Sequence, residues 1–169
     1  VWLDSGTRRE YCGHLDLISA RPSKALIAQT PWQIELTDNG QTRRLDRSQA
    51  DLWLEQQIHP NESEMLAVDL PFNGGLIGYI GYEWQNPSYK IPIKHHFRTP
   101  LVNLGLYDWA IIVDHDKCQA YCLITAHVSS LLLADILSTL KDHDPAYCVD
   151  SAEFTCGAFS PTTAKQQYL

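Results

Sequence analysis

Short segments in which apolar and polar residues alternate recur along this chain and restrict its fold more than any other feature. The clearest is 32–36, which an Asp-Asn-Gly sequence at 38–40 separates from a second segment, 41–45. Alternation places the apolar side chains of a strand on one face, and Asn-Gly is a frequent hairpin turn. Residues 15–20 and 25–28 predict two further strands. We therefore expect an antiparallel meander with one face in solvent over the first third of the chain.

Three more strands are predicted in the rest of the chain. Residues 103–113 and 119–126 would form a hairpin around a polar Asp-His-Asp-Lys turn. The third strand carries a glycine at every third position, namely Gly75, Gly78 and Gly81. Such glycines are typical of a strand that another backbone approaches closely. Their spacing differs from the G-x-G-x-x-G of a dinucleotide site, so we interpret them as structural.

Helices are predicted from apolar residues at helical spacing. Ser48 and Asp51 are placed as a capping box for the first helix, and the second helix begins at residue 129 or 130. Thr163 and Gln166 have the same spacing near the end of the chain. The predicted buried stripes are Ala50, Trp53, Leu54 and Ile58 in the first helix, and Leu133, Ile136, Leu137 and Leu140 in the second. With the strands, these helices predict an α+β fold, a mainly antiparallel β-sheet with two or three helices packed on it.

Composition excludes several classes of protein. The chain has 169 residues, 44% of them hydrophobic, and 13 Lys and Arg against 20 Asp and Glu give a net charge of −7. This acidic balance argues against binding to nucleic acid or to an anionic membrane. No apolar run approaches the roughly 18–20 residues that span a membrane. Five cysteines without framework spacing predict reduced thiols and a cytoplasmic protein.

The sequence contains few residue patterns that indicate catalysis or metal binding. Cys118 and Cys122 are four residues apart and would share a face of a strand, but a single Cys-x3-Cys pair is a weak metal signal. The adjacent His95 and His96 would point to opposite sides of an extended backbone. No nucleophile elbow or Cys/His signature is present. We therefore expect no metal site and no catalytic residue in this chain.

Asp4 and Ser5 form the most promising polar pair. They follow a short apolar strand and precede Gly6, which allows a backbone to approach a ligand closely. An amino-acid ligand needs an acceptor for its ammonium group and donors for its carboxylate, and this pair with the nearby amides offers both. The same residues are also the usual ones in turns.

Five segments of the chain form a recognisable set of motifs. They are Leu3-Asp4-Ser5, Leu70-Pro71-Phe72 with Gly74-Gly75, Gly78-Tyr79 with Gly81-Tyr82-Glu83, Tyr107-Asp108-Trp109 with Val113-Asp114-His115, and Phe159-Ser160-Pro161 through Tyr168. Together they resemble the large subunits of anthranilate synthase and aminodeoxychorismate synthase. The resemblance runs from residue 2 to residue 169 and is strongest in the "PF-x-GG…GY-x-GYE" signature, which is quite specific. The hairpin segment is more similar to the aminodeoxychorismate branch than to the anthranilate branch.

The resemblance implies a parent enzyme that aminates chorismate on the 4-aminobenzoate and folate pathway. Ammonia would come from a glutamine amidotransferase partner, and Mg²⁺ would hold the carboxylate of chorismate. In this family the catalytic and metal-binding residues belong to a C-terminal chorismate-binding domain. We therefore expect residues 1–158 to be the N-terminal domain and 159–169 the start of a truncated chorismate-binding domain. The N-terminus, without Met or a leader sequence, fits a trimmed or excised chain that is catalytically silent.

The N-terminal domain of this family also helps to form a tryptophan pocket, and Ser5 matches the pocket serine. The following wall, usually Tyr-Ser-Arg-Tyr/Phe before an Asp, corresponds here to Cys12, Gly13, His14 and Leu15 before Asp16. The loss of an aromatic ring and of an Arg removes stacking area and a partner for a carboxylate. We expect tryptophan binding by the chain alone to be weak or absent.

Two alternatives remain open at this stage. One is the anthranilate synthase subunit of the same family, and the other is a stand-alone β-rich module that binds a small molecule. Excision from a larger enzyme would leave an exposed apolar patch, for which Tyr79, Trp84 and Phe159 are candidates.

Overall fold

A computed structural model describes residues 1–6, 13–58, 70–85 and 99–141, together with residues 157, 158, 160 and 166. The chain divides into two compact units, Val1–Ser130 and Leu131–Leu169. The predicted domain boundary between residues 158 and 159 stays a prediction.

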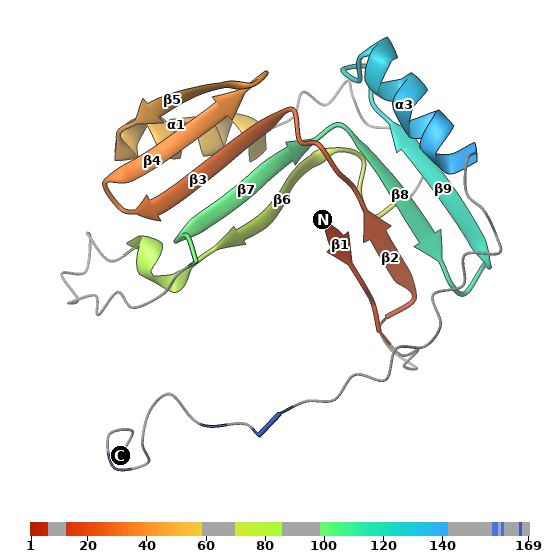
Figure 1. Cartoon of the computed structure of the whole chain (residues 1–169), viewed down its shortest axis with the longest axis horizontal. Helices are drawn as coiled ribbons and strands as arrows, with labels where there is room; N and C mark the ends of the chain where they lie inside the picture. Colours follow the sequence, from red (N-terminus) through yellow and green to blue (C-terminus); the bar gives the residue numbers. More distant parts are fainter. Residues whose placement is uncertain are drawn as a thin grey trace. The chain divides into compact units, whose positions relative to one another are not determined.

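The first unit contains two antiparallel sheets (Figure 1). The four-stranded sheet consists, in spatial order, of β1 (Trp2–Leu3), β2 (Leu15–Ile18), β8 (Trp109–Asp114) and β9 (Gln119–Ile124). The five-stranded sheet consists of β5 (Gln41–Leu45), β4 (Gln33–Asp38), β3 (Lys24–Thr30), β7 (Val102–Tyr107) and β6 (Gly75–Ile80). With two α-helices, α1 and α3, in the described part of the chain, this architecture confirms the predicted α+β class.

The predicted meander is confirmed only in part. Strands β3, β4 and β5 follow one another in a meander, and the turn between β4 and β5 has positive φ at Asn39 (48°) and Gly40 (80°), as the sequence predicts. The first predicted strand, β2, pairs instead with β1 and β8 in the other sheet. Alternation fixes which face of a strand is buried but not which strand becomes its neighbour.

The prediction of one continuous strand over 103–113 is wrong. The structure divides it at Asp108 into β7 and β8, which belong to different sheets. At the break, the carbonyl of Asp108 accepts a hydrogen bond from the backbone N–H of Thr125 (2.9 Å). The apolar pattern continues on both sides of Asp108, so periodicity alone does not reveal the break.

Helix α1 (Arg47–Ile58) begins one residue before the predicted cap. The backbone N–H of Gln49 donates to Asp46 Oδ1 (2.8 Å), and the backbone N–H of Asp46 donates to Gln49 Oε1 (3.0 Å). This reciprocal pair is the capping box, so the predicted box of Ser48 and Asp51 is wrong. Asp51 instead accepts a bifurcated hydrogen bond from the single N–H of Arg47 Nε, at both carboxylate oxygens.

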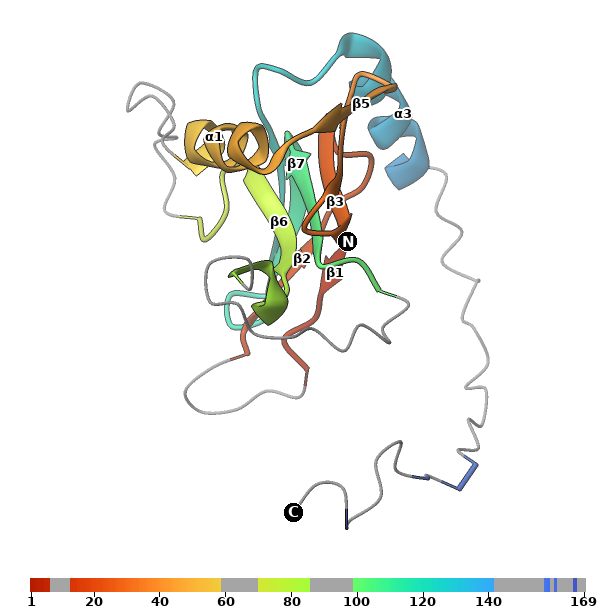
Figure 2. The ribbon, with the colours of Figure 1, turned by 90° about the vertical axis from the view of Figure 1, so that its left-hand side faces the viewer.

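Helix α1 covers one face of the five-stranded sheet (Figure 2). Three of its four predicted stripe residues are buried, but Ile58, at the last position of the helix, is exposed. The core cluster consists of Leu26, Ala28, Ile34, Leu36, Leu45, Ala50, Trp53, Leu54, Trp84, Leu101, Val102 and Leu104. Trp84, predicted to be exposed, is buried in this cluster, and the Arg47 guanidinium lies 3.6 Å from the centroid of its ring. Tyr79 is exposed as predicted, and Phe159 lies outside the described residues.

The close backbone approach predicted for the glycine strand is confirmed. Gly78 faces Leu104 across the β6–β7 ladder, and a methyl group at Gly78 would overlap the carbonyl of Asn103. A methyl group at Gly81 would lie 2.9 Å from the carbonyl oxygen of Leu101. The two glycines therefore allow the end of β6 to run closely along β7.

Helix α3 (Ser130–Lys141) begins where the sequence predicts. Of its predicted stripe, Ile136 is buried and Leu133 is half-buried. Leu137 and Leu140 are exposed, so the prediction for them is wrong. The spacing marks a common apolar side of the helix, but burial along that side depends on what lies against each turn. Thr163, the first residue of the second predicted capping box, lies outside the described residues.

Candidate functional site

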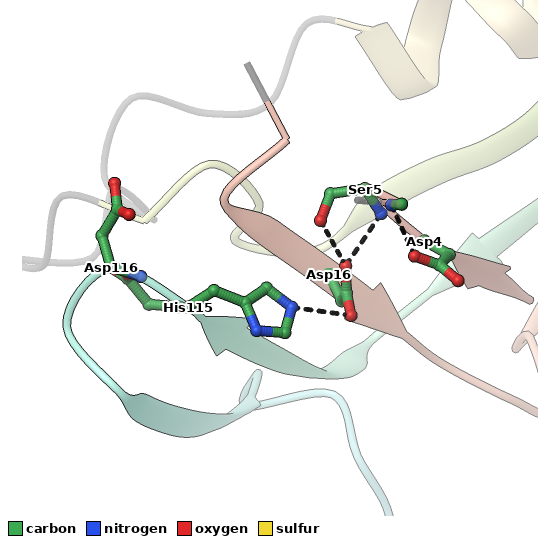
Figure 3. Close-up of polar contacts among 7 residues, drawn as sticks. Asp4, Ser5, Asp16, His115 and Asp116 are labelled. Atoms are coloured by element: carbon green, nitrogen blue, oxygen red, sulfur yellow. Dashed lines mark hydrogen bonds and ion pairs between the residues drawn. The ribbon is translucent and has the colours of Figure 1, made fainter. Parts of the chain in front are cut away.

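The polar contacts around Ser5 connect three segments that lie far apart in the sequence (Figure 3). Strand β1 ends at Leu3, which pairs with Leu17 of β2, and Ser5 lies just beyond this ladder. Asp16, on β2, accepts two hydrogen bonds from Ser5 at the same oxygen, Oδ1. One comes from the backbone N–H (2.8 Å) and the other from the hydroxyl Oγ (2.7 Å).

His115 approaches Asp16 from the turn after β8. Its Nε2 lies 2.9 Å from Asp16 Oδ2, the oxygen that Ser5 leaves free. The β2–β8 ladder, which pairs Leu15 with Asp114, brings His115 to this position. A backbone hydrogen bond from the N–H of His115 to the carbonyl of His14 (2.8 Å) adds a second connection.

These donors stabilise the ionised form of Asp16. The backbone N–H of Ser5, its hydroxyl group and the imidazole of His115, in that order, lower the pKa of the Asp16 carboxyl from 3.8 to about 2. An ionised carboxylate only accepts hydrogen bonds. His115 Nε2 therefore carries the proton that it shares with Asp16.

The arrangement is not that of a catalytic serine. A nucleophilic serine gives its proton to a base such as an imidazole. Here the single hydroxyl proton of Ser5 goes to the carboxylate, and His115 contacts the other oxygen of the same carboxylate. The site therefore holds Ser5 in place and does not activate it.

Asp4 and Gly6 form a tight turn around Ser5. The backbone N–H of Gly6 donates to Asp4 Oδ1 (2.6 Å), and Gly6 has a φ of 68°. The carboxylate of Asp4 thus has the role in a turn that its residue type suggested.

The other predicted wall residues are only partly described. Gly13 has a φ of 87°, and a methyl group there would lie 2.8 Å from the carbonyl oxygen of Ser5, so glycine allows this contact. His14 contributes its carbonyl to the hydrogen bond with His115, and Leu15 begins β2. Cys12 lies outside the described residues. The structure therefore brings Ser5 and Gly13 together, and a ligand pocket at these residues stays a prediction.

Sequence reasoning missed the roles of Asp16 and His115. They are 99 positions apart, and no local pattern connects them. The predicted hairpin did indicate where His115 lies, because the hairpin turn places it directly after β8. Its side chain can therefore reach the strand that pairs with β8.

The cysteine pair does not share a strand face as predicted. Cys118 lies in the turn before β9 with a φ of 52°, whereas Cys122 lies within β9. Cys122 is exposed at the surface, and partial desolvation of its thiol raises the pKa. Within the part of the chain that the structure describes, no group of three or more His, Cys, Asp or Glu side chains is placed to hold a metal ion.

The face of the four-stranded sheet that carries Asp16 is apolar and open. Register places the buried Trp109 and the half-buried Ile124 at one end of this face. Six further apolar residues make up the rest of it: Trp2, Ile18, Ile111, Val113, Ala120 and Cys122. Trp2 is 65% exposed and Ile18 is 38% exposed. An apolar surface of this kind is typical of a binding or interaction site. We call these six residues the open face.

Acid is expected to remove the stabilisation that Asp16 provides. Because its pKa is lowered from 3.8 to about 2, the contribution is complete above about pH 5 and is lost as the pH falls through 3.8 towards 2. The free energy of unfolding of the wild-type chain should therefore decrease between pH 4 and pH 2 more steeply than that of Asp16→Asn. Urea unfolding at several pH values, followed by fluorescence, measures this difference. Parallel profiles for the two proteins would contradict the role of Asp16.

No α-helix among the described residues is long and apolar enough to cross a membrane.

No protein-family model matches the chain. Among curated proteins, it is 30% identical over 118 residues to aminodeoxychorismate synthase component 1 of Klebsiella aerogenes, which covers 68% of this chain and 26% of that protein. It is 43% identical over 84 residues to the protein of the same name from Salmonella typhimurium, which covers 44% of this chain and 18% of that protein. The chain thus spans about a quarter or less of the length of these relatives.

Among solved structures, anthranilate synthase component I from Streptococcus pneumoniae TIGR4 has a similar fold. The TM-score is 0.59 at 22% sequence identity, over 82% of this chain and 32% of that one. The chain is therefore similar in sequence to aminodeoxychorismate synthase component 1 and shares its fold with part of anthranilate synthase component I.

Proposed function

We propose that this chain is a non-catalytic region of a chorismate-aminating enzyme of the aminodeoxychorismate synthase component 1 type. It supports the catalytic domain and contributes one wall of a tryptophan pocket. The observation that carries this proposal is the 30% identity with aminodeoxychorismate synthase component 1 over 68% of the chain. The parent enzyme would convert chorismate to 4-amino-4-deoxychorismate in the cytoplasm, for the synthesis of 4-aminobenzoate and folate.

The catalytic residues of the parent would lie outside this chain. The polar cluster of the described residues holds a serine without activating it, and the same residues offer no group of three metal ligands. The family resemblance assigns the Mg²⁺ of the parent to its C-terminal chorismate-binding domain, and we propose the same here. The name "component 1" of the relatives supports a second component, which we propose to be a glutamine amidotransferase that supplies ammonia.

The tryptophan pocket would lie where the polar cluster meets the open face. Ser5 and the negative charge of Asp16 suit the ammonium group of an amino acid. The apolar side chains of the open face suit an indole ring. The C-terminal domain would cover the open face and supply the remaining walls.

Calorimetry with L-tryptophan tests the completeness of the pocket. We expect the 169-residue chain alone to bind tryptophan weakly or not at all. The segment from Cys12 to Leu15 lacks an aromatic ring and the Arg of the usual wall, and the other walls are absent. A dissociation constant in the low micromolar range would contradict this view.

Anthranilate synthase component I is the second candidate, and the fold it shares with this chain favours it. Its identity of 22% is lower than the 30% and 43% of the aminodeoxychorismate synthases. The product that the complete protein forms from chorismate and ammonia decides between the two. A stand-alone binding module would be supported instead by a reading frame that ends soon after codon 169.

A further inference from the structure

The position of Ser5 does not follow from the sheet alone. The β1–β2 ladder pairs Trp2 with Ile18 and Leu3 with Leu17, and Ser5 lies two residues beyond its last pair. Both polar groups of Ser5 that can donate, its backbone N–H and its hydroxyl, are bound by Asp16 Oδ1. Asp16 therefore fixes both the backbone and the side-chain rotamer of Ser5.

This arrangement also decides what Ser5 offers to a ligand. A hydroxyl group has one proton to donate and two lone pairs to accept with. Since the proton is directed at Asp16 over 2.7 Å, the remaining capacity of Ser5 Oγ is that of an acceptor. Ser5 thus presents an acceptor to a ligand N–H group, with a carboxylate behind it.

The side chain of Asp16 is itself held in place by a contact with His115. Its side chain is only 15% exposed, and its second oxygen contacts His115 Nε2. The turn that carries His115 is closed by the buried Asp114, whose Oδ1 accepts from the backbone N–H groups of Asp116 (3.1 Å) and Lys117 (2.9 Å). A defined path of contacts therefore runs from the β8–β9 turn through His115 and Asp16 to Ser5.

We propose that Asp16 and His115 are positioning residues of the tryptophan pocket, in which Asp16 orients Ser5 as an acceptor for the ligand ammonium and His115 holds Asp16 in place. This inference rests on the pocket proposed above. It assigns to the β8–β9 turn a part in ligand affinity, although the turn itself does not touch the ligand. It also differs from a purely structural role, in which Asp16 would only attach β1 to β2.

The first test needs no ligand. Hydrogen–deuterium exchange of the segment that contains Ser5 is measured in the complete protein. Asp16→Ala is expected to accelerate exchange of the Ser5 amide at least tenfold, because that amide loses its acceptor. Asp16→Asn keeps an oxygen acceptor and should restore much of the protection. Asp38→Ala is the matched control, since Asp38 is a half-exposed carboxylate that pairs with Lys24 in the other sheet. Unchanged exchange in Asp16→Ala would overturn the proposal.

The second test is a double-mutant cycle for L-tryptophan affinity, measured by calorimetry in the complete protein. Ser5→Ala and Asp16→Ala are each expected to weaken binding about tenfold, and His115→Ala less. If Asp16 acts through Ser5, the double variant binds no more weakly than Ser5→Ala alone. His115→Gln, which keeps a side-chain N–H donor, should recover part of the loss.

The outcomes separate the two proposals. Full additivity of Ser5→Ala and Asp16→Ala would overturn the positioning role and leave the pocket intact. Wild-type complete protein that binds no tryptophan would overturn the pocket, and this inference with it. Affinity that Asp16→Ala leaves unchanged would overturn the positioning role alone.

Discussion

Replacing Gly78 by alanine is expected to lower the free energy of unfolding by about 4 kcal/mol, among the largest effects of a single substitution. Two causes act together at this position. The added methyl group would overlap the carbonyl of Asn103 on β7, and the backbone has a φ of 150°, which residues with a side chain rarely adopt. The neighbouring atoms belong to the backbone of a central strand, so they cannot move away cheaply. Equilibrium urea unfolding measures the change.

Gly75→Ala is the matched control for this substitution. Gly75 begins the same strand and has a φ of 135°, but a methyl group there meets no atom within 4 Å. Its variant should lose only the conformational part, about 1–2 kcal/mol. Equal losses for Gly75→Ala and Gly78→Ala would show that the close approach of β6 to β7 is not the cause.

Replacing Trp109 by alanine is expected to cost about 4 kcal/mol. Trp109 opens β8 directly after the chain changes sheets, and its side chain is 8% exposed. Its Nε1 donates to the carbonyl of Ala20 (2.9 Å), and its own carbonyl accepts from the hydroxyl of the buried Ser19 (2.6 Å). The substitution would leave a large cavity where the two sheets are joined and would remove the hydrogen bond to the carbonyl of Ala20.

Two further variants separate the contributions of Trp109. Trp109→Phe keeps most of the packing and loses the indole N–H, so a loss of about 1–2 kcal/mol is expected. Trp32→Ala removes a tryptophan that is 80% exposed, just before β4, and should change stability by no more than about 0.5 kcal/mol. Similar losses for Trp32→Ala and Trp109→Ala in urea unfolding would contradict the burial described here.

Local patterns predicted the elements of the fold well, because side-chain periodicity and turn residues act over a few positions. The hairpin turn at Asn39 and Gly40 and the buried residues Ala50, Trp53 and Leu54 follow from such patterns. The prediction of the helix cap was wrong because two neighbouring residue pairs fit the same rule. Asp46 with Gln49 fits the capping-box rule as well as Ser48 with Asp51, and the earlier pair caps α1.

Local patterns could not predict which strands that lie far apart in the sequence pair with one another. The division of 103–113 between two sheets depends on which strands stand beside β7 and β8, and β7 pairs with β3 and β6 while β8 pairs with β2 and β9. The contacts of the candidate site also depend on which strands pair. Ser5 was identified from a family resemblance, whereas Asp16 and His115 meet only through the β2–β8 ladder. A single sequence contains no local sign of that pairing.

The assignment of catalysis to another domain is tested most directly by an assay of the purified 169-residue chain with chorismate, ammonia and Mg²⁺. We expect no conversion of chorismate above the rate without protein, because the proposal assigns catalysis to the C-terminal domain and Ser5 is held here as an acceptor. Formation of 4-amino-4-deoxychorismate or anthranilate by this chain alone would contradict that assignment.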